Sequence, residues 1–390
     1  MARPLGAPRV TARPRWRATA AVVVLNLAAA AAVVTLVGPL GDPGAVVRAG
    51  AAMPSAIDAG EWWRLLTCVW LHFDILHLTI NLMCVWLVGR WVESLYGSAA
   101  MLAMFGTAGL VGSLTSHLAG GVGLGAGVSG AVFGLIGAAA AELLARRPTR
   151  GGAGSSLGMR LLVVALAQLL VDLALPAVDR WAHAGGFLVG VLLGLAWSPH
   201  RPPGRARRAV TVALASALAA ATAAAAALVI ATPVTTTYDR GGLGRHVVGG
   251  VAVTAPARWR VDGDEVGDAE LSVWLAVARE PVGTAAEHEA YLADEPSRTR
   301  ARGLGRSSPA TPRIELPAGW GGHERTAVVD SDVGDELRYR VLTAIGPAPG
   351  SPGQGLRVSL YLPETLVAPL ARRLAATLAS LQVVTPPPAP

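Results

Sequence analysis

The sequence has few charged residues and no lysine. Only 15% of its 390 residues are charged, and all 33 basic residues are arginine. Hydrophobic residues make up 52% of the chain and the mean hydropathy is positive, which is typical of a membrane protein. The exclusive use of arginine in an Ala- and Gly-rich chain indicates genome base composition, and we expect no nucleic-acid partner.

Cysteine and metal-binding patterns are also scarce. The two cysteines, Cys68 and Cys84, cannot build a disulfide framework, and Cys84 lies inside an apolar run as a small buried residue. The chain lacks a His-Glu-x-x-His pattern, which argues against a zinc protease. It also lacks paired carboxylates within its apolar runs, which argues against a proton-driven carrier. We therefore expect no cofactor and no bound metal.

Seven apolar runs are long enough to cross a bilayer as helices. We expect these spans at residues 18–40, 76–96, 99–119, 127–145, 157–176, 181–198 and 208–232. Up to residue 232 the chain has 17 arginines against 8 acidic residues. The arginines gather before the first span, between the fourth and fifth, and between the sixth and seventh, so the positive-inside rule predicts a cytoplasmic N-terminus. The chain would then be a multi-pass protein of the cell membrane.

This topology predicts four parts. They are a basic cytoplasmic N-terminus at 1–17, a six-helix membrane core at 18–200, a seventh transmembrane helix at 208–232 and an extracytoplasmic domain at 233–390. The expected fold is therefore an all-α polytopic membrane bundle followed by a small α+β soluble domain. The external loop at 41–75 contains Trp63 and Arg64 and has the composition of a segment that lies in the membrane interface.

Alternating apolar patterns predict the elements of the last domain. We expect strands at 247–261, 270–278, 325–329, 336–344 and 355–362, and helices at 285–294 and 364–381. The run 251–259 and the closing helix resemble the small sandwich domains of the PsbP-like type. No catalytic group stands out in this domain, and its ligand or regulator is unknown.

Polar side chains gather at one depth of the predicted bundle. Spans two, four and six all run from the outside to the inside, so their first residues lie near the outer surface. Span two contributes His77 and Asn81, span four contributes Ser129, and span six contributes His183. Intramembrane polar groups are costly and usually face a bundle interior or a water-filled cavity. We expect these four side chains to lie close together.

The serine has the surroundings of a nucleophile. Ser129 lies between Gly127 and Gly130 at the start of a helix, so its hydroxyl is uncovered and the positive end of the helix dipole is near. With His183 it makes a nucleophile and base pair. His77 and Asn81, spaced i and i+4, could donate hydrogen bonds to an oxyanion together with the Ser129 backbone N–H.

Each of these residues also has a structural interpretation. The Gly-x-Ser-Gly pattern occurs in ordinary helix packing, and His77 and Asn81 could form interhelical hydrogen bonds. Asp179, one turn before His183, could orient the imidazole or be a solvated interfacial carboxylate. We interpret Glu93 as a structural tie near the inner surface and His72 as a brace of the external loop. A face of small residues is expected to pack spans four and six together, formed by Gly130, Gly134, Gly137, Gly186, Gly190 and Gly194.

The pattern resembles the rhomboid family of intramembrane serine proteases. The likeness covers about residues 18–200 and rests on Trp63-Arg64, on His72, His77 and Asn81, on Gly127-Val128-Ser129-Gly130 and on Ala182-His183-Ala184-Gly185-Gly186. It implies a serine endopeptidase that cleaves transmembrane segments of protein substrates within the lipid bilayer. Ser129 would be the nucleophile, His183 the base, and His77 and Asn81 oxyanion donors.

The resemblance also implies roles for supporting residues. Trp63 and Arg64 would belong to the membrane-embedded external loop. Phe133 stands where several relatives carry a tyrosine that packs on the histidine, and a phenyl ring can still pack there. The seventh span matches only part of the family, in which six-span members are common.

Two rival classes remain open. One is an inactive rhomboid-like protein that binds membrane clients without cutting them, although the presence of both Ser129 and His183 favours an enzyme. The other is a transporter or channel that uses His72, His77 and His183 for protons or metal.

Overall fold

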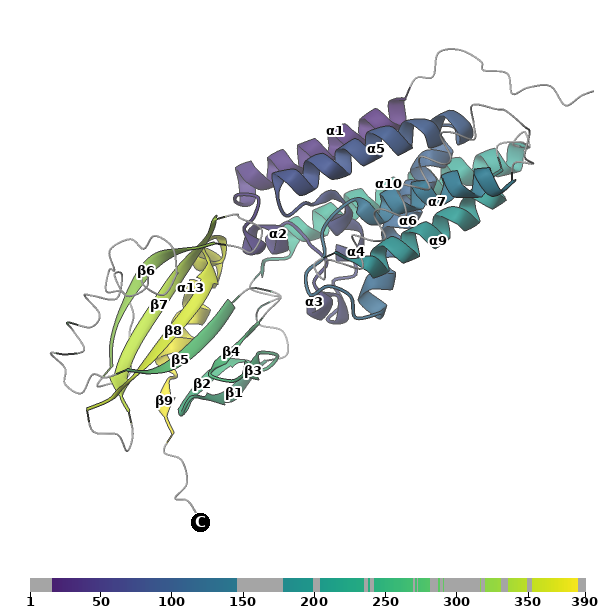
Figure 1. The fold of residues 1–390 in the computed structure, drawn as a ribbon. Coiled ribbons are helices and arrows are strands. Elements are labelled where there is room, and N and C mark those ends of the chain that lie inside the picture. Colours follow the sequence, from purple (N-terminus) through teal and green to yellow (C-terminus); the bar gives the residue numbers. More distant parts are fainter. Residues whose placement is uncertain are drawn as a thin grey trace, which may run out of the picture. The chain divides into compact units, whose positions relative to one another are not determined.

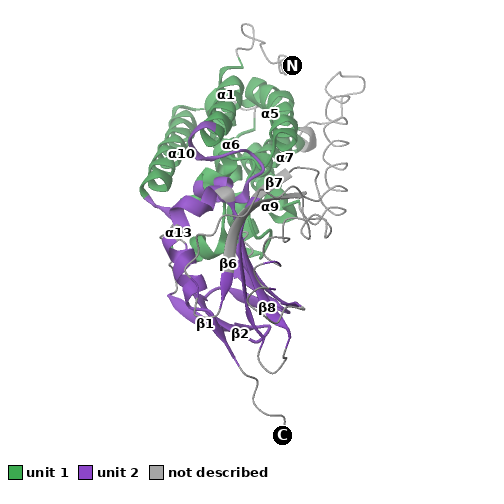
Figure 2. Ribbon diagram, turned by 90° about the vertical axis from the view of Figure 1, so that its left-hand side faces the viewer, with its two compact units in different colours: residues 1–34, 49–231 green, residues 35–48, 232–390 purple. Residues whose placement is uncertain are grey.

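The computed structural model describes residues 16–145, 178–198, 204–234, 238, 242–268, 271, 273–280, 287, 290, 316, 320–330, 336–348 and 353–384. The chain folds into two compact units (Figure 2). Unit 1 consists of residues 1–34 and 49–231, and unit 2 of residues 35–48 and 232–390. The predicted fifth span at 157–176 lies outside the described residues, as does all but two residues of the helix predicted at 285–294.

Unit 1 is built from apolar helices (Figure 1). Their bounds lie close to the predicted spans: α1 (Arg17–Ala32) with a π-helical turn (Val33–Val37), α5 (Ile75–Tyr96), α6 (Ser98–Leu118), α7 (Ser129–Ala145), α9 (Arg180–Ala196) and α10 (Arg205–Ala231). Within the described residues, four are long and apolar enough to cross a membrane, namely Arg17–Val37, α5, α6 and α10, while α7 and α9 are shorter apolar helices. A 17-residue helix is still roughly 25 Å long. The prediction of a membrane protein with several apolar helices is confirmed.

These helices expose apolar side chains outward. Val24 on α1, Leu87 on α5 and Leu188 on α9 are 60% exposed or more. A helix satisfies its backbone polar groups internally, so such a surface is stable against hydrocarbon. The outward faces of unit 1 therefore suit contact with lipid.

Small residues let α7 and α9 approach closely. Gly186 and Gly190 are buried on α9, and an ideal Cβ at either position would overlap a carbonyl oxygen of α7, that of Gly130 or that of Gly134. At Gly112 of α6 an added Cβ would lie 2.7 Å from the carbonyl oxygen of Ala182. The predicted small-residue face is confirmed by these contacts.

Glu93 ties the ends of three helices together. Its buried carboxylate accepts hydrogen bonds from the backbone N–H groups of Ala18 (3.0 Å) and Thr19 (2.9 Å) at the start of α1, and from the hydroxyls of Thr19 and Ser98, each at 2.7 Å. A carboxylate at this end of α1 also complements the helix dipole. The predicted structural tie is confirmed.

The loop predicted to be external, residues 41–75, contains short helices and one isolated bridge. In unit 1 it carries α3 (Pro54–Asp58), α4 (Arg64–Thr67) and a 3-10 turn (Cys68–Trp70). Ala52 and Gly125 exchange backbone hydrogen bonds of 2.8 Å. The loop is therefore joined to the segment that leads into α7.

Unit 2 contains two antiparallel sheets. The three-stranded sheet has the order β1 (Leu243–Val248), β2 (Val251–Pro256), β9 (Gln382–Val383). The six-stranded sheet has the order β3 (Arg260–Asp262), β4 (Glu265–Asp268), β5 (Val273–Glu280), β8 (Gly355–Pro363), β7 (Glu336–Pro347), β6 (Gly321–Asp330). The helix α13 (Glu364–Ala379) packs on β7 and β8. The expectation of a C-terminal region with a sheet is confirmed.

The core of unit 2 contains apolar side chains that recur at every second residue of β8 and at every fourth residue of α13. Side chains at alternate positions of β8 are fully buried, as are leucines every fourth residue along α13: Leu356, Val358, Leu360, Leu362, Leu366, Leu370, Leu374 and Leu378. The predicted single strand at 247–261 is wrong. Gly249 and Gly250 have positive φ angles and form a turn that pairs Val248 with Val251, so the segment folds into parts of β1, β2 and β3.

Candidate active site

Ser129 and His183 form a hydrogen-bonded pair between two helices. Ser129 is the first residue of α7, and His183 lies in the first turn of α9. The Oγ atom of Ser129 is 2.8 Å from Nε2 of His183, and the histidine is only 5% exposed. With Nε2 unprotonated, the hydroxyl donates to it, which is the arrangement that can activate a serine oxygen.

The imidazole of His183 is held from a second side by an aromatic ring. Phe133 lies one turn after Ser129 on α7, and its ring stacks on His183 with a centroid distance of 4.2 Å and an angle of 13°. Asp179 caps α9, since its carboxylate accepts from the backbone N–H of Ala182 at 3.0 Å. This capping contact belongs to neither of the two interpretations of Asp179, and it gives the residue a structural role at the start of α9.

His77 lies beside the chain that enters α7. Gly127 has a φ of 137°, and an ideal Cβ there would lie 3.0 Å from both Cε1 and Nε2 of His77 and 3.8 Å from Oγ of Ser129. Asn81 is buried one turn further along α5, and its side-chain nitrogen donates to the backbone oxygen of His77 at 2.9 Å. The structure thus brings His77, Gly127, Ser129 and His183 together, with Asn81 behind His77.

Replacing Gly127 by alanine tests this packing. The new methyl group would press on the ring of His77, and the positive φ would cost about 1–3 kcal/mol of strain for a residue with a side chain. We expect the serine protease activity that the sequence resemblance implies to fall about tenfold or more, because His77 moves. Gly123→Ala is the matched control, since its Cβ would meet nothing within 4 Å. Equal rates for the two variants would contradict this prediction.

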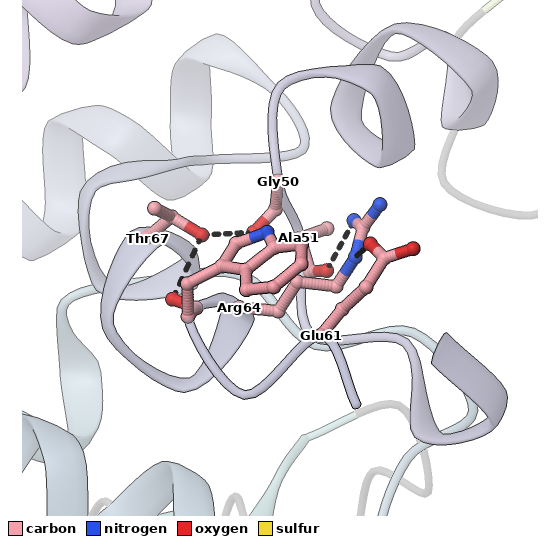
Figure 3. Close-up of polar contacts among 6 residues, drawn as sticks. Gly50, Ala51, Glu61, Arg64 and Thr67 are labelled. Atoms are coloured by element: carbon pink, nitrogen blue, oxygen red, sulfur yellow. Dashed lines mark hydrogen bonds and ion pairs between the residues drawn. The ribbon is translucent and has the colours of Figure 1, made fainter. Parts of the chain in front are cut away.

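Arg64 holds the loop before α5 in place through buried contacts (Figure 3). Its guanidinium forms an ion pair with Glu61 and donates to the backbone oxygen of Ala51 at 3.0 Å. The hydroxyl of Thr67 donates to the backbone oxygen of Gly50 at 2.6 Å. Glu61, Arg64 and Thr67 are all buried. Buried charges and carbonyls joined in this way fix the loop in one conformation.

Trp63 and His72 lie in the same loop as Arg64, before the start of α5. Trp63 is half-buried, and His72 is 2% exposed with its ring 5.1 Å from that of His77 in an edge-on arrangement. Burial, with a smaller electrostatic contribution from His77, lowers the pKa of His72 to about 3, so its ring is neutral. His72 therefore packs as an uncharged group against His77.

Two further residues position the site and were missing from the sequence prediction. Asp74 caps α5 by accepting from the backbone N–H of His77 at 2.7 Å, and an aspartate just before an apolar helical run is a recognisable N-cap signal. The backbone oxygen of Cys68 accepts from the N–H of Gly127 at 3.0 Å. No sequence signal could identify this second contact, because it uses only the main chain.

Apolar helices of this length, two of which bring a hydrogen-bonded serine and histidine together near their starts, are features of a membrane protein with a polar site inside its bundle. Residues 59–200 match the family model of the rhomboid domain. The chain therefore contains a segment that matches the rhomboid domain.

Several known proteins are similar to this domain. RHOMBOID-like protein 5 of Arabidopsis thaliana is 38% identical over 149 residues, which is 38% of this chain and 48% of the relative. Rhomboid protease GluP of Bacillus subtilis (strain 168) is 37% identical over 145 residues, 37% of this chain and 28% of the relative. Rhomboid-like protease 3 of Toxoplasma gondii is 33% identical over 150 residues, 37% of this chain and 55% of the relative. The chain spans about half or less of the length of these relatives, so the likeness concerns the domain alone.

A solved structure is similar to another part of the chain. The solution structure of cyanobacterial PsbP (CyanoP) from Synechocystis sp. PCC 6803 covers 36% of this chain and 92% of its own, with 17% identity and a TM-score of 0.27. This score is too low to support an argument, and the PsbP-like assignment stays a prediction.

Proposed function

We propose that the protein is an intramembrane serine endopeptidase that cleaves transmembrane segments of membrane-protein substrates. The observation that carries the proposal is the 2.8 Å contact between Oγ of Ser129 and Nε2 of His183. The similarity to relatives named as proteases, GluP among them, supports the same activity. In this proposal His183 is the base and Ser129 the nucleophile.

The reaction follows from the two side chains. Oγ of Ser129 attacks the scissile carbonyl carbon while Nε2 of His183 takes the hydroxyl proton, giving a tetrahedral oxyanion. His183 then returns the proton to the leaving amide nitrogen, and the peptide bond breaks to leave an acyl ester on Ser129. A water molecule, deprotonated by His183, hydrolyses the ester and restores the serine.

The oxyanion needs donors on the side of Ser129. We propose the backbone N–H of Ser129, at the positive end of α7, together with the side chains of His77 and Asn81. The amide nitrogen of Asn81 carries two N–H groups, and its bond to the His77 oxygen uses one of them. The other is available for a substrate oxyanion.

The domain plan and orientation belong to the same proposal. We propose six core helices within 18–200, a seventh at 208–232, a cytoplasmic segment at 1–17 and an extracytoplasmic domain at 233–390. The distribution of arginines supports this orientation in the cell membrane. Trp63 and Arg64 then lie in the outer leaflet, with the Arg64 contacts holding the external loop.

Substrate helicity provides the test. A helical carbonyl is blocked by its own hydrogen bond, so a substrate must unwind before Ser129 can attack it. In liposomes that contain the full chain and a single-span substrate, we expect cleavage, and we expect a Gly-Pro pair near the scissile bond to speed it. A Leu-Leu pair at the same position is the matched control. An intact substrate in both cases would favour an inactive, client-binding protein.

A further inference from the structure

The start of the external loop is part of the C-terminal unit. Residues 35–48 belong to unit 2 together with 232–390 (Figure 2). The carboxylate of Asp42, only 6% exposed, accepts from the hydroxyl of Thr365 at 2.8 Å and from the backbone N–H of Ala45 at 3.1 Å. The guanidinium of Arg48 donates to the backbone oxygens of Thr365 (3.1 Å) and Val37 (3.2 Å). Thr365 lies in the first turn of α13, so the loop is bonded to this helix from two directions.

The fit at this junction is close. An ideal Cβ at Gly44 would lie 2.6 Å from Oγ1 of Thr365 and 2.7 Å from Cγ of Leu366, and one at Gly38 would overlap the Thr365 methyl group. The helix α2 (Pro43–Arg48) contributes side chains that are fully or almost fully buried, from Ala45 to Val47. Backbone packed this closely against a side chain indicates a specific contact.

The same loop continues into the residues that hold the candidate active site. Two residues after Arg48, the backbone oxygen of Gly50 accepts from Thr67, and that of Ala51 accepts from Arg64. Directly after Thr67, the backbone oxygen of Cys68 accepts from the N–H of Gly127, which lies two residues before Ser129. Every step from Thr365 to Ser129 is thus a hydrogen bond or a short piece of continuous chain.

We infer that the C-terminal domain braces the external loop that leads into the rhomboid domain. The docking surface is the first turn of α13, and the segment that binds to it is residues 38–48. The inference rests on the proposed function for its effect on cleavage. Release of 38–48 loosens the segment that carries Trp63 and Arg64, and a transmembrane substrate is then cleaved more slowly. The domain at 233–390 is therefore a positioning element of the enzyme.

The docking itself can be tested by a reversible cross-link. The ideal Cβ position of Gly38 lies 3.6 Å from Cβ of Thr365, which is within the range for a disulfide. In the full chain, Gly38→Cys combined with Thr365→Cys should cross-link under mild oxidation, as measured by protection of both thiols from a maleimide mass tag. Each single variant is the control and should stay reactive. Cys68 and Cys84 are present in every variant, so the parent chain sets the background of tags. Two tags above that background in the oxidised double variant would overturn the docking.

The effect on the site is measured on the same double variant. Reduction removes the cross-link from a chain that also lacks the Thr365 hydroxyl, so we expect cleavage of a single-span substrate in liposomes to fall about threefold or more on reduction and to recover on oxidation. Labelling of Ser129 by a small fluorophosphonate should stay the same in both states, since the probe does not need the external loop. The parent chain, treated with the same reductant, should not change.

Two substitutions of Thr365 separate the effect of its hydroxyl group from the effect of its side-chain volume. Thr365→Val keeps the shape but removes the donor to Asp42, whereas Thr365→Ser keeps the donor. We expect slower substrate cleavage in the valine variant only. Equal cleavage by both variants, and by the oxidised and reduced double variant, would overturn the brace even if the cross-link forms. Loss of Ser129 labelling in the parent chain would instead contradict the proposed function, and the thiol-protection result would still decide the docking.

Discussion

Ser129→Ala is expected to abolish cleavage of a single-span substrate. Removing Oγ removes the atom that forms the acyl ester in the proposed reaction, so the rate should fall by about 10⁴-fold or more. His183→Ala should lower the rate as strongly, because it removes Nε2, the proposed base that lies 2.8 Å from Oγ of Ser129. The two residues act as one unit, so the double variant should be no worse than either single variant. Initial rates of product formation in liposomes measure all three.

Controls separate chemistry from folding. Asn81→Ala should keep partial turnover, because loss of one oxyanion donor costs about 10²–10³-fold. Thermal unfolding in detergent should be unchanged for Ser129→Ala and His183→Ala. Cleavage that survives in the serine variant would rule out Ser129 as the nucleophile, and an unfolded histidine variant would favour a structural role for His183.

Gly190→Val is expected to disrupt the membrane core. An ideal Cβ at this position already overlaps the backbone oxygen of Gly134, and a backbone atom cannot move aside as a side chain can. The loss of folding free energy should exceed that of ordinary overpacking, which is about 1–3 kcal/mol. We expect a strong fall in thermal stability, measured by unfolding in detergent, and the loss of substrate cleavage, since α7 and α9 carry Ser129 and His183.

The matched control adds bulk to the outer face of the same helix. Leu192→Phe enlarges a side chain of α9 that is 57% exposed, so the midpoint of unfolding should stay near that of the parent. An unfolding midpoint for Gly190→Val equal to that of the control would mean that α7 and α9 are not packed through this glycine.

Much of unit 1 could be predicted from the sequence because bilayer thickness and helix packing leave clear signals. Apolar length gave the described helices to within a few residues, and glycines every fourth residue on α9 indicated close packing with α7. The meeting of Ser129 and His183 followed from topology, since both begin helices that run in the same direction. The positive φ of Gly127 and its contact with His77 required coordinates.

Other features had no usable signal. The bond between Asp42 and Thr365 joins residues 323 positions apart, and neither residue belongs to a pattern. The error at 247–261 arose because the apolar residues on both sides of Gly249 and Gly250 share one strand-like pattern, which hid the turn. Cys68 acts on Gly127 only through its main-chain oxygen, so its side chain carries no information about the contact.

Covalent labelling of the intact chain tests the central claim most directly. A fluorophosphonate reacts only with a serine oxygen that a neighbouring base activates, and peptide mass spectrometry locates the adduct. We predict a single adduct on Ser129 that disappears in His183→Ala and persists in Gly123→Ala. An adduct on another serine, or labelling of Ser129 that does not depend on His183, would contradict a catalytic pair between α7 and α9.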